Sequence, residues 1–461
     1  MATSAQAKFL TGDLMRHVIV MALSASFGLL SMFVVDFVDL YFISLLGSSA
    51  LTAAVGFAGT LLFFNMSVGI GLMIAMGALA ARRIGRGDAD GARKIATNVL
   101  VFGLAIGLIV GMGTFSFAPQ LLDLIGASGE AKARGVSYLR IVSPSMPVMV
   151  VGMVSSGLLR AHGDARRAMN ATLAAGFVNA ILDPIFIFAL GFGLEGAAMA
   201  SVCARFAMAA TALFPVLKHY GGFAPFERAR FLGDLEAIIG IAAPAILTNV
   251  ATPVGTLIVM RFVAGYGDDV VAGFSVISRL TPLAFCVIFA LSGAVGPIIG
   301  QNFGAGDYPR VRETLRKALQ FAAAYTGVVW ILLLIANQFV SAQFSLSPEG
   351  AALMTMFALV VTPLYFFNGV LFIANAAFNN LNRPTWSTLL NWGKNTIGVL
   401  PFVWVGAAAA GAEGVIVGQA LGGVVFALLA VWLAFRLTNA YASGAVDPDV
   451  AWRPAFMKAK A

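Results

Sequence analysis

Long apolar stretches separated by short polar segments dominate this chain. Most contain about 20–30 residues, enough for a helix to cross a hydrocarbon layer of roughly 30 Å. Continuous apolar runs such as residues 100–112 lack the alternation of a membrane β-barrel, so the spans are expected to be helices. The pattern predicts an all-α integral membrane protein with twelve transmembrane helices, at residues 14–43, 49–80, 95–118, 135–161, 168–190, 196–217, 236–264, 270–302, 314–337, 351–380, 385–408 and 413–437.

The two halves of the sequence resemble each other. Residues 84–88, IGRGD, recur as residues 303–307, FGAGD, and Pro144 falls at the same offset as Pro363. Both Gly-x-Gly-Asp loops follow an even number of spans, which predicts two six-helix bundles running in the same sense, related by an internal repeat. In each loop, glycine should form a tight turn and the aspartate should cap the next helix. The predicted domains are an N-terminal lobe (1–217), a cytoplasmic linker (218–235), a C-terminal lobe (236–437) and a cytoplasmic tail (438–461).

Composition and charge agree with a membrane protein. The chain is 60% hydrophobic and 11% charged, with a mean hydropathy of +0.90, which excludes an ordinary soluble domain. Most of its 29 Lys and Arg residues fall on the side of the two termini, which predicts that both termini are cytoplasmic. The expected location is the plasma (inner) membrane of a prokaryote. The net charge of +8 is therefore a topology signal that also suits contact with membrane lipids, and it does not indicate a nucleic-acid partner.

Three acidic residues lie well inside the apolar spans: Asp36, Asp39 and Asp183. A carboxylate in hydrocarbon is costly, so such residues usually face a cavity, have a partner and carry function. Counting residues from the ends of the spans puts all three at a similar depth, about 6–10 Å below the outer surface at 1.5 Å per residue. They are therefore candidates for cation coupling.

Two neutral oxygen donors fall near the same level as the carboxylates. Asn179 precedes Asp183 by one helical turn, and Ser201 lies five residues into the next span. Together with Asp39 and Asp183 these groups form a hard-oxygen site that suits either Na⁺ or a proton shared between the two carboxylates. The alternative is that Asn179 and Asp183 only cap a helix break at Pro184.

The second half has no matching carboxylates and no equivalent cation site. Its neutral groups Asn249 and Asn368, with Asn65 of the first half, could line a substrate cavity or merely bridge helices. Arg279, inside a span, could balance a buried charge or bind anionic lipid. The sequence contains no metal-ligand or nucleophile pattern, so we expect neither an enzyme nor a cofactor beyond H⁺ or Na⁺ as coupling ion.

These motifs resemble the multidrug and toxic compound extrusion (MATE) family, in particular its DinF-like branch. The resemblance rests on residues 38–40 (VDL), the loop at 85–88, residues 179–184 (NAILDP) and residues 300–307 (GQNFGAGD). It implies two six-helix lobes and export of organic molecules driven by inward H⁺ or Na⁺. It further implies a cation site, for H⁺ or Na⁺, formed by Asp39, Asn179, Asp183 and Ser201. Tyr138 resembles the tyrosine that relatives place near the same cavity.

Two positions depart from that family pattern. Ser24 stands where relatives often have a proline in helix one, which argues against switching by a proline bend there. Asn249 stands where another branch has an acidic residue, which argues against a second sodium site.

The sequence thus predicts a monomeric antiporter that exports amphipathic, often cationic organic compounds by alternating access. A lipid-linked-oligosaccharide flippase of the same superfamily and an integral-membrane enzyme are the alternatives. A flippase should carry more basic residues in its cavity, and an enzyme should carry a metal or nucleophile constellation.

Overall fold

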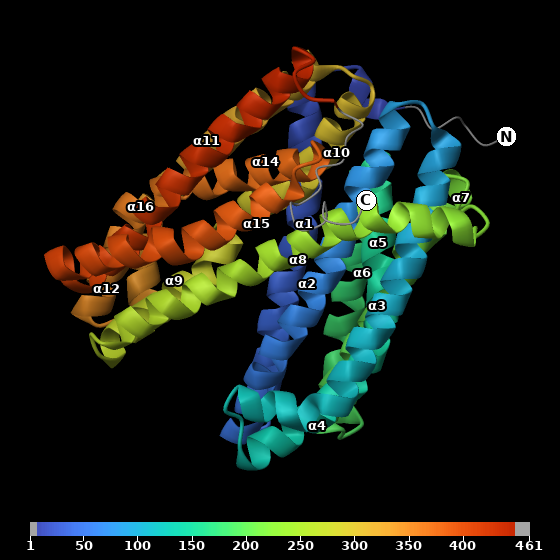
Figure 1. Ribbon diagram of the computed structural model, residues 1–461. Helices are drawn as coiled ribbons and strands as arrows, with labels where there is room; N and C mark the ends of the chain where they lie inside the picture. The colour runs from blue at the N-terminus through green and yellow to red at the C-terminus, as the bar shows by residue number, and fades with distance from the viewer. Residues whose placement is uncertain (1–6, 448–461) are drawn as a thin grey trace. The chain divides into compact units, whose positions relative to one another are not determined.

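The computed structural model describes residues 7–447, almost all of them helical (Figure 1). Within this range, eleven helical segments are long and apolar enough to cross a membrane. The last, Pro384–Ala442, is divided by non-helical backbone at Ala410 and Gly411 and supplies two crossings. The described chain therefore has the twelve crossing segments that the apolar pattern predicts. Residues 448–461, most of the predicted tail, lie outside the described residues.

Two compact units make up the chain. Unit 1 is Ser24–Ala242 with the residues up to Lys8, and unit 2 is Phe9–Leu23 with the chain from Ala243 onward. Helices α1 (Leu14–Ser44) and α8 (Arg228–Ala264) are therefore each divided between the two units. Because α8 begins at Arg228, the non-helical connection occupies only residues 220–227 of the predicted linker.

Unit 1 packs its helices around small and aliphatic side chains. Besides parts of α1 and α8, it contains α2 (Ser49–Gly85), α3 (Ala89–Leu124), α4 (Gly129–Val142), α5 (Met146–Ala161), α6 (Ala165–Pro184) and α7 (Gly193–His219). One buried apolar cluster includes Ile84, Ile95 and Leu159, near the Gly-x-Gly-Asp loop. A second cluster includes Leu139 and Leu194, at the other ends of the helices.

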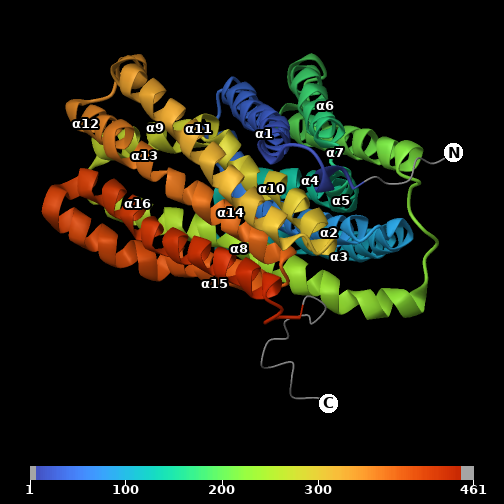
Figure 2. The ribbon, with the colours of Figure 1, turned by 90° about the horizontal axis from the view of Figure 1, so that it is seen from above.

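Unit 2 repeats this arrangement with more interrupted helices. It contains α9 (Asp268–Ala284), α10 (Cys286–Gly304), α11 (Tyr308–Gln343), α12 (Pro348–Met356), α13 (Thr362–Leu364), α14 (Phe366–Asn380), α15 (Pro384–Gly393) and α16 (Val399–Ala442). Figure 2 shows α10 beside α14, and these two helices are in extensive contact.

Proline residues mark interruptions at equivalent places of the repeat. Pro144 lies in a 3₁₀ turn, Ser143–Ser145, between α4 and α5. Pro363 follows a π-helical segment, Phe357–Val361, between α12 and α13. Proline has no N–H to donate and its ring crowds the preceding turn, which favours an interruption at both places.

The two Gly-x-Gly-Asp loops have the predicted geometry. Gly87 and Gly306 both have φ of +76°, a left-handed conformation that glycine adopts without strain. Asp88 accepts a hydrogen bond from the Gly91 N–H at 2.8 Å, and Asp307 accepts one from the Arg310 N–H at 3.0 Å. The predicted turn and cap are thus confirmed in both halves.

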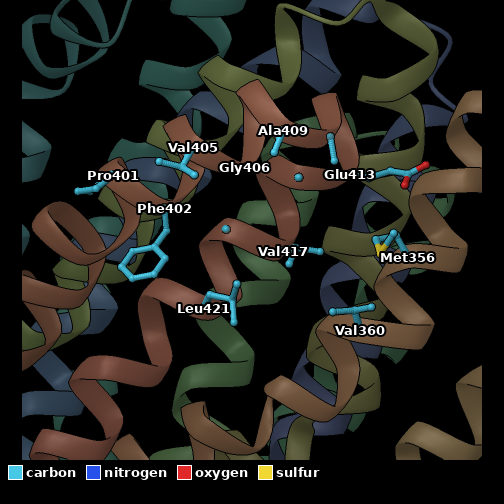
Figure 3. A pocket seen from close by; sticks show the side chains of 13 residues that line it. Met356, Val360, Pro401, Phe402, Val405, Gly406, Ala409, Glu413, Val417 and Leu421 are labelled. Atoms are coloured by element: carbon cyan, nitrogen blue, oxygen red, sulfur yellow. The ribbon is translucent and has the colours of Figure 1, made fainter.

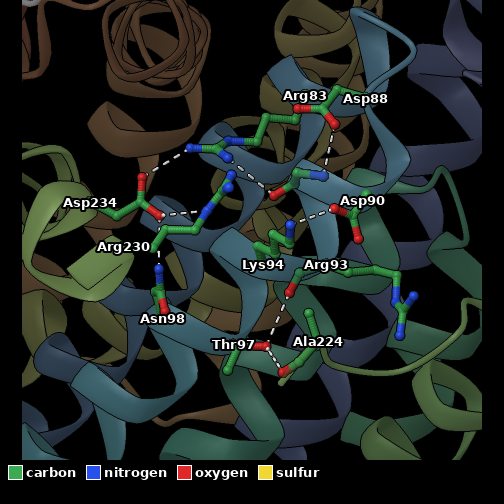
Figure 4. A network of polar contacts seen from close by, with 11 residues as sticks. Arg83, Asp88, Asp90, Arg93, Lys94, Thr97, Asn98, Ala224, Arg230 and Asp234 are labelled. Atoms are coloured by element: carbon green, nitrogen blue, oxygen red, sulfur yellow. Dashed lines mark hydrogen bonds and ion pairs between the residues drawn. The ribbon is translucent and has the colours of Figure 1, made fainter. Parts of the chain in front are cut away.

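The first part of α8 is anchored in unit 1 by a polar network next to the Gly-x-Gly-Asp loop (Figure 4). Asp234 of α8 accepts hydrogen bonds from Arg83 at 3.0 Å and from Asn98 at 2.8 Å. Arg230 lies 3.8 Å from the same carboxylate. These charged contacts explain why the start of α8 packs with unit 1 although most of the helix belongs to unit 2.

A corresponding anchor holds the segment before α1 in unit 2. Phe9 is 1% exposed, and its N–H donates to the Gln301 side chain at 2.8 Å. The Arg310 guanidinium donates to the carbonyls of Phe9 (3.0 Å), Thr11 (3.0 Å) and Gly12 (2.8 Å). Each unit therefore holds the start of a helix that continues into the other unit.

A loop cluster in unit 1 combines a half-buried histidine, His162, with the ion pair of Asp164 and Arg167. His162 stacks on Tyr220 with ring centroids 4.2 Å apart, and the Tyr220 hydroxyl donates to Asp164 at 2.7 Å. Burial lowers the pKa of His162 from 6.5 to about 4, although the charge of Asp164 opposes this shift. Burial would raise the pKa of Asp164, but hydrogen bonds from Tyr220 and Arg167 outweigh it and lower that pKa.

We predict that Arg310→Gln releases the segment before α1. The substitution removes charged hydrogen bonds to three backbone carbonyls, and one such bond contributes roughly 1.5–3 kcal/mol. Hydrogen–deuterium exchange of residues 8–13 should accelerate by about tenfold or more. Arg312→Gln is the matched control, because Arg312 is an exposed residue of the same helix. Unchanged exchange in Arg310→Gln would show that the anchor does not depend on this guanidinium.

We predict that the His162→Phe variant loses less stability on acidification than the wild type. The unfolded chain takes up a proton near pH 6.5 and the folded chain only near pH 4, so the folded state loses stability as pH falls through this interval. Phenylalanine keeps the stacking on Tyr220 but does not titrate. Between pH 7 and pH 4.5 the Tm of the variant should fall less than that of the wild type. His219→Phe, at an exposed position, should keep the wild-type slope; an equal slope in His162→Phe contradicts the prediction.

Candidate cation-coupling site

Two carboxyl groups meet inside unit 1. Asp39 is in the part of α1 that belongs to unit 1, and Asp183 lies one residue before the end of α6. Their side chains are within interaction range of each other. Asp183 is 0% exposed, and within the described chain no N–H or O–H group donates to either of its carboxyl oxygens. Two ionised carboxylates can only accept, so this contact becomes a hydrogen bond when one of them carries a proton.

Asn179 links the two carboxyl-bearing helices. It is 3% exposed and lies one turn before Asp183 on α6. With its amide nitrogen turned toward α1, it donates to the Asp39 carboxyl oxygens at 2.9 and 3.3 Å. The amide oxygen then faces away from Asp39. Asn179 therefore holds Asp39 against α6 and does more than cap the break at Pro184.

Tyr138 and Ser201 form the neighbouring layer of the site. Tyr138 of α4 is 8% exposed, and its hydroxyl group lies near Ser201 of α7. The charges of Asp39 and Asp183 act on the Tyr138 hydroxyl. The structure thus brings Asp39, Asn179, Asp183 and Ser201 into one region with the predicted tyrosine.

Asp36 is placed differently from the other two acids. It lies one turn before Asp39 on α1, and its side chain is exposed. Its charge acts on Asp39, but it makes no hydrogen bond or ion pair within residues 7–447. It therefore contributes electrostatically and does not belong to the contact between the two buried carboxyl groups.

Arg205 has a structural role next to this site. It follows Ser201 by one turn on α7 and donates to the Val142 carbonyl at 3.1 Å and to the Ser145 hydroxyl at 2.9 Å. The Val142 carbonyl ends α4 where the 3₁₀ turn interrupts the helix. The guanidinium thus satisfies an acceptor that the break exposes, and it forms no ion pair with Asp39 or Asp183.

The Asp39–Asp183 pair therefore has no positively charged partner in the described part of the chain. Its contacts include one amide donor but no cationic side chain paired with it in the described part of the chain. Two carboxylates at such range in a poor dielectric do not both ionise cheaply. The arrangement can hold one proton shared between the carboxyl groups or a small cation that accepts their oxygens as ligands.

The predicted substrate-cavity asparagines make contacts within their own units. Asn65 is 6% exposed and hydrogen-bonds with Thr114 at 3.2 Å, between α2 and α3. Asn249 donates to the Ala245 carbonyl of its own helix at 2.8 Å. Asn368 accepts a hydrogen bond from Lys394. Their role in a substrate cavity stays a prediction.

Two basic residues of unit 2 fall inside the spans predicted from the sequence. Arg279 on α9 is exposed and forms no hydrogen bond or ion pair with the described residues. Lys394 is half-buried at the start of a π-helical segment, Lys394–Gly398. The sequence analysis did not identify Lys394 as a candidate site residue. A lysine at the tenth position of the predicted span 385–408 is itself an indication of function, because a charge inside the membrane is costly.

An apolar cavity of about 490 Å³ lies in unit 2, between α12, the π-helical segment after it and α16 (Figure 3). Met356, Val360, Phe402 and Leu421 contribute to its wall, and Glu413 is its one charged lining residue. Neither Asn249 nor Asn368 lines it. This cavity is therefore separate from the predicted polar substrate residues.

Comparison with known proteins gives consistent similarities. The sequence matches the MatE family over residues 25–185 and 244–405, one match in each half, which agrees with the internal repeat. An FAD transporter of Shewanella oneidensis is 28% identical, over 93% of this chain and 96% of that protein. The multidrug export protein MepA of Staphylococcus haemolyticus is 25% identical, over 87% and 89% of the respective chains.

Solved structures show the same fold at 22% identity. An outward-facing multidrug resistance MATE family transporter of the MOP superfamily aligns with a TM-score of 0.89, over 96% of this chain and 100% of that chain. A MOP superfamily transporter from Pyrococcus furiosus aligns with a TM-score of 0.87, over 96% and 99%. The predicted all-helical fold with its internal repeat is thereby confirmed.

We predict that Asp39 and Asp183 are energetically coupled. Residues that share one proton or cation show non-additive effects, whereas distant residues add to within about 0.5 kcal/mol. The change in unfolding free energy of Asp39→Asn with Asp183→Asn should differ from the sum of the two single changes by more than this. Combining Asp183→Asn with Glu349→Gln, at an exposed residue of unit 2, should give additive changes. If the changes in unfolding free energy are additive in both double variants, Asp39 and Asp183 are not energetically coupled.

Proposed function

Because the chain belongs to the MatE family, we propose that it is a secondary active antiporter that exports amphipathic, often cationic organic compounds in exchange for H⁺ or Na⁺. It is a multi-pass membrane protein. Like its named relatives, it is a transporter and not an enzyme. The coupling ion, the direction of transport and the cargo are the proposed parts of this function.

One observation carries the proposal: buried Asp183 and half-buried Asp39 form a pair that lacks a cationic partner in the described chain. A pair of this kind has two states that differ by one positive charge, loaded and empty. The loaded state is tolerated in an apolar interior, whereas the empty state needs water or another cation. Loading from one side of the membrane and release on the other would bias the two conformations of an alternating-access cycle.

The residues around the pair have separate proposed roles. Asn179 orients Asp39, and Ser201, which lies near Tyr138, supplies a hydroxyl ligand for a cation. Asp36, being exposed, attracts the cation toward the pair. We favour H⁺ over Na⁺, because the ligand set around the pair offers few neutral oxygens to complete a sodium shell.

The orientation follows from the distribution of charge. We propose that both termini and both Gly-x-Gly-Asp loops are cytoplasmic in the plasma membrane, and that the six-helix halves 1–217 and 236–437 act as the two lobes of a monomer. The pair then lies nearer the outer ends of α1 and α6, where an external proton can reach it. Among the cargoes named for relatives, FAD and multiple drugs both belong in a test panel.

The decisive experiment measures dye efflux from liposomes that contain the purified protein. Proton coupling predicts release of loaded ethidium when the exterior is acidified in Na⁺-free buffer. Efflux that ignores a pH gradient but follows a Na⁺ gradient at constant pH would reassign the same residues to a sodium site. Efflux that follows neither gradient would refute the antiporter.

We predict that Asp183→Asn abolishes coupled efflux without preventing folding. The amide has the size of the carboxyl group but cannot change its charge, so gradient-driven efflux should fall by at least about tenfold. Asp123→Asn is the matched control, because Asp123 forms a surface ion pair with Lys132. Efflux by Asp183→Asn at the level of Asp123→Asn would remove Asp183 from the mechanism.

A further inference from the structure

Lys394 places a positive charge near the middle of a crossing segment of unit 2. It follows Pro384, the first residue of α15, by ten residues, or about 15 Å of helix at 1.5 Å per residue. Asn368 precedes the end of α14 at Asn380 by twelve residues, or about 18 Å. Both depths are about half of a roughly 30 Å hydrocarbon layer, far from either polar surface.

The ammonium group has one polar partner within the described chain. Lys394 Nζ donates to Asn368 Oδ1, which leaves two of its three N–H donors without a protein acceptor. No carboxylate forms an ion pair with it among residues 7–447. The acidic residues of unit 2 in this range lie in loops or near helix ends: Asp13, Asp268, Asp269, Asp307, Glu313, Glu349, Glu413 and Asp447.

The neighbouring amides do not supply the missing acceptors. Asn391, three residues before Lys394, donates to Asn375 at 3.0 Å and to the Ser387 carbonyl at 2.7 Å. Asn395 donates to the Asn391 carbonyl at 2.9 Å. These residues satisfy one another, whereas Lys394 keeps unused donors. An unpaired ammonium inside a membrane is costly, so its retention favours a ligand of opposite charge.

The residues around Lys394 position its ammonium group but do not bury it completely. The lysine stem passes close to α16, where a methyl group added at Gly423 would lie 3.3 Å from Lys394 Cε. Lys394 and Asn368 are each half-buried. Tyr365, one turn before Asn368, stacks on Phe285 with ring centroids 4.0 Å apart. A flat aromatic pair thus lies one helical turn from the hydrogen-bonded charge.

We propose that Lys394 and Asn368 form an oxyanion-binding subsite of unit 2, which holds a carboxylate or phosphate group of a planar aromatic substrate. This inference rests on the proposed transport function and deepens it. Unit 2 then selects cargo by an acidic group, so the exported compounds include zwitterions and anions as well as cations.

The test compares two dyes that differ only at one acidic group. Rhodamine 110 has a free carboxylate, and rhodamine 123 is its methyl ester. Fluorescence anisotropy with purified full-length protein gives the affinity for each dye. The wild type should bind the carboxylate dye at least about tenfold more tightly, the effect of one charge-assisted hydrogen bond.

Three variants locate the preference. Lys394→Met should bring the affinity ratio close to one, and Lys394→Arg should retain most of the preference because it keeps the charge. Asn368→Asp should also remove the preference, because the new carboxylate forms an internal ion pair with the Lys394 ammonium and competes with the dye. Lys317→Met is the matched control, since Lys317 pairs with Glu313 on α11.

Two results would overturn the proposal. One is a wild-type ratio near one, including failure to bind the carboxylate dye. The other is a preference that survives in Lys394→Met, or in Asn368→Asp if the methionine variant does not fold. Dye binding does not depend on an ion gradient, so these outcomes are distinct from a failure of gradient-driven efflux.

Discussion

The absence of water around most of these helices is the constraint on which the rest of the structure depends. A polar group in that setting must find a partner in the protein or remain costly. Arg205 illustrates the first outcome, because its guanidinium bonds to the Val142 carbonyl and the Ser145 hydroxyl at a helix break. Asp183 and Lys394 illustrate the second, because each retains unused hydrogen-bonding capacity in the described chain. The groups left incomplete are the ones to which the proposed functions are assigned.

The division of α1 and α8 between the units connects the carboxyl pair to the rest of the chain. Helix α1 carries Asp39 in unit 1, while the segment before it is held in unit 2 by Arg310 and Gln301. Helix α8 is arranged in the reverse order, since Asp234 near its start is held in unit 1 by Arg83. A change of charge at Asp39 therefore acts on a helix that both units hold. This continuity offers a physical route from ion loading to conformational change.

The two halves have kept the same framework and diverged in charge. The Gly-x-Gly-Asp turns, their aspartate caps and the proline interruptions recur in both units. Unit 1 contains a carboxyl pair, whereas unit 2 carries a lysine held by an amide. Framework positions are constrained by backbone geometry in each copy, but an interior side chain is free to change once its own contacts change. Opposite charges in the two halves agree with the proposed exchange of a cation for a substrate.

The sequence alone determined the features that depend on local order. Apolar length predicts the twelve crossings, the repeat predicts both capped turns, and helical spacing places Asn179 one turn from Asp183. The tertiary structure decided which distant residues meet: Asn179 with Asp39, Tyr138 with Ser201, and Lys394 with Asn368. It also decided that each unit holds the start of a helix of the other. Helical periodicity fixes only neighbours three or four residues apart, whereas contacts between helices depend on how whole faces pack, which no local pattern encodes.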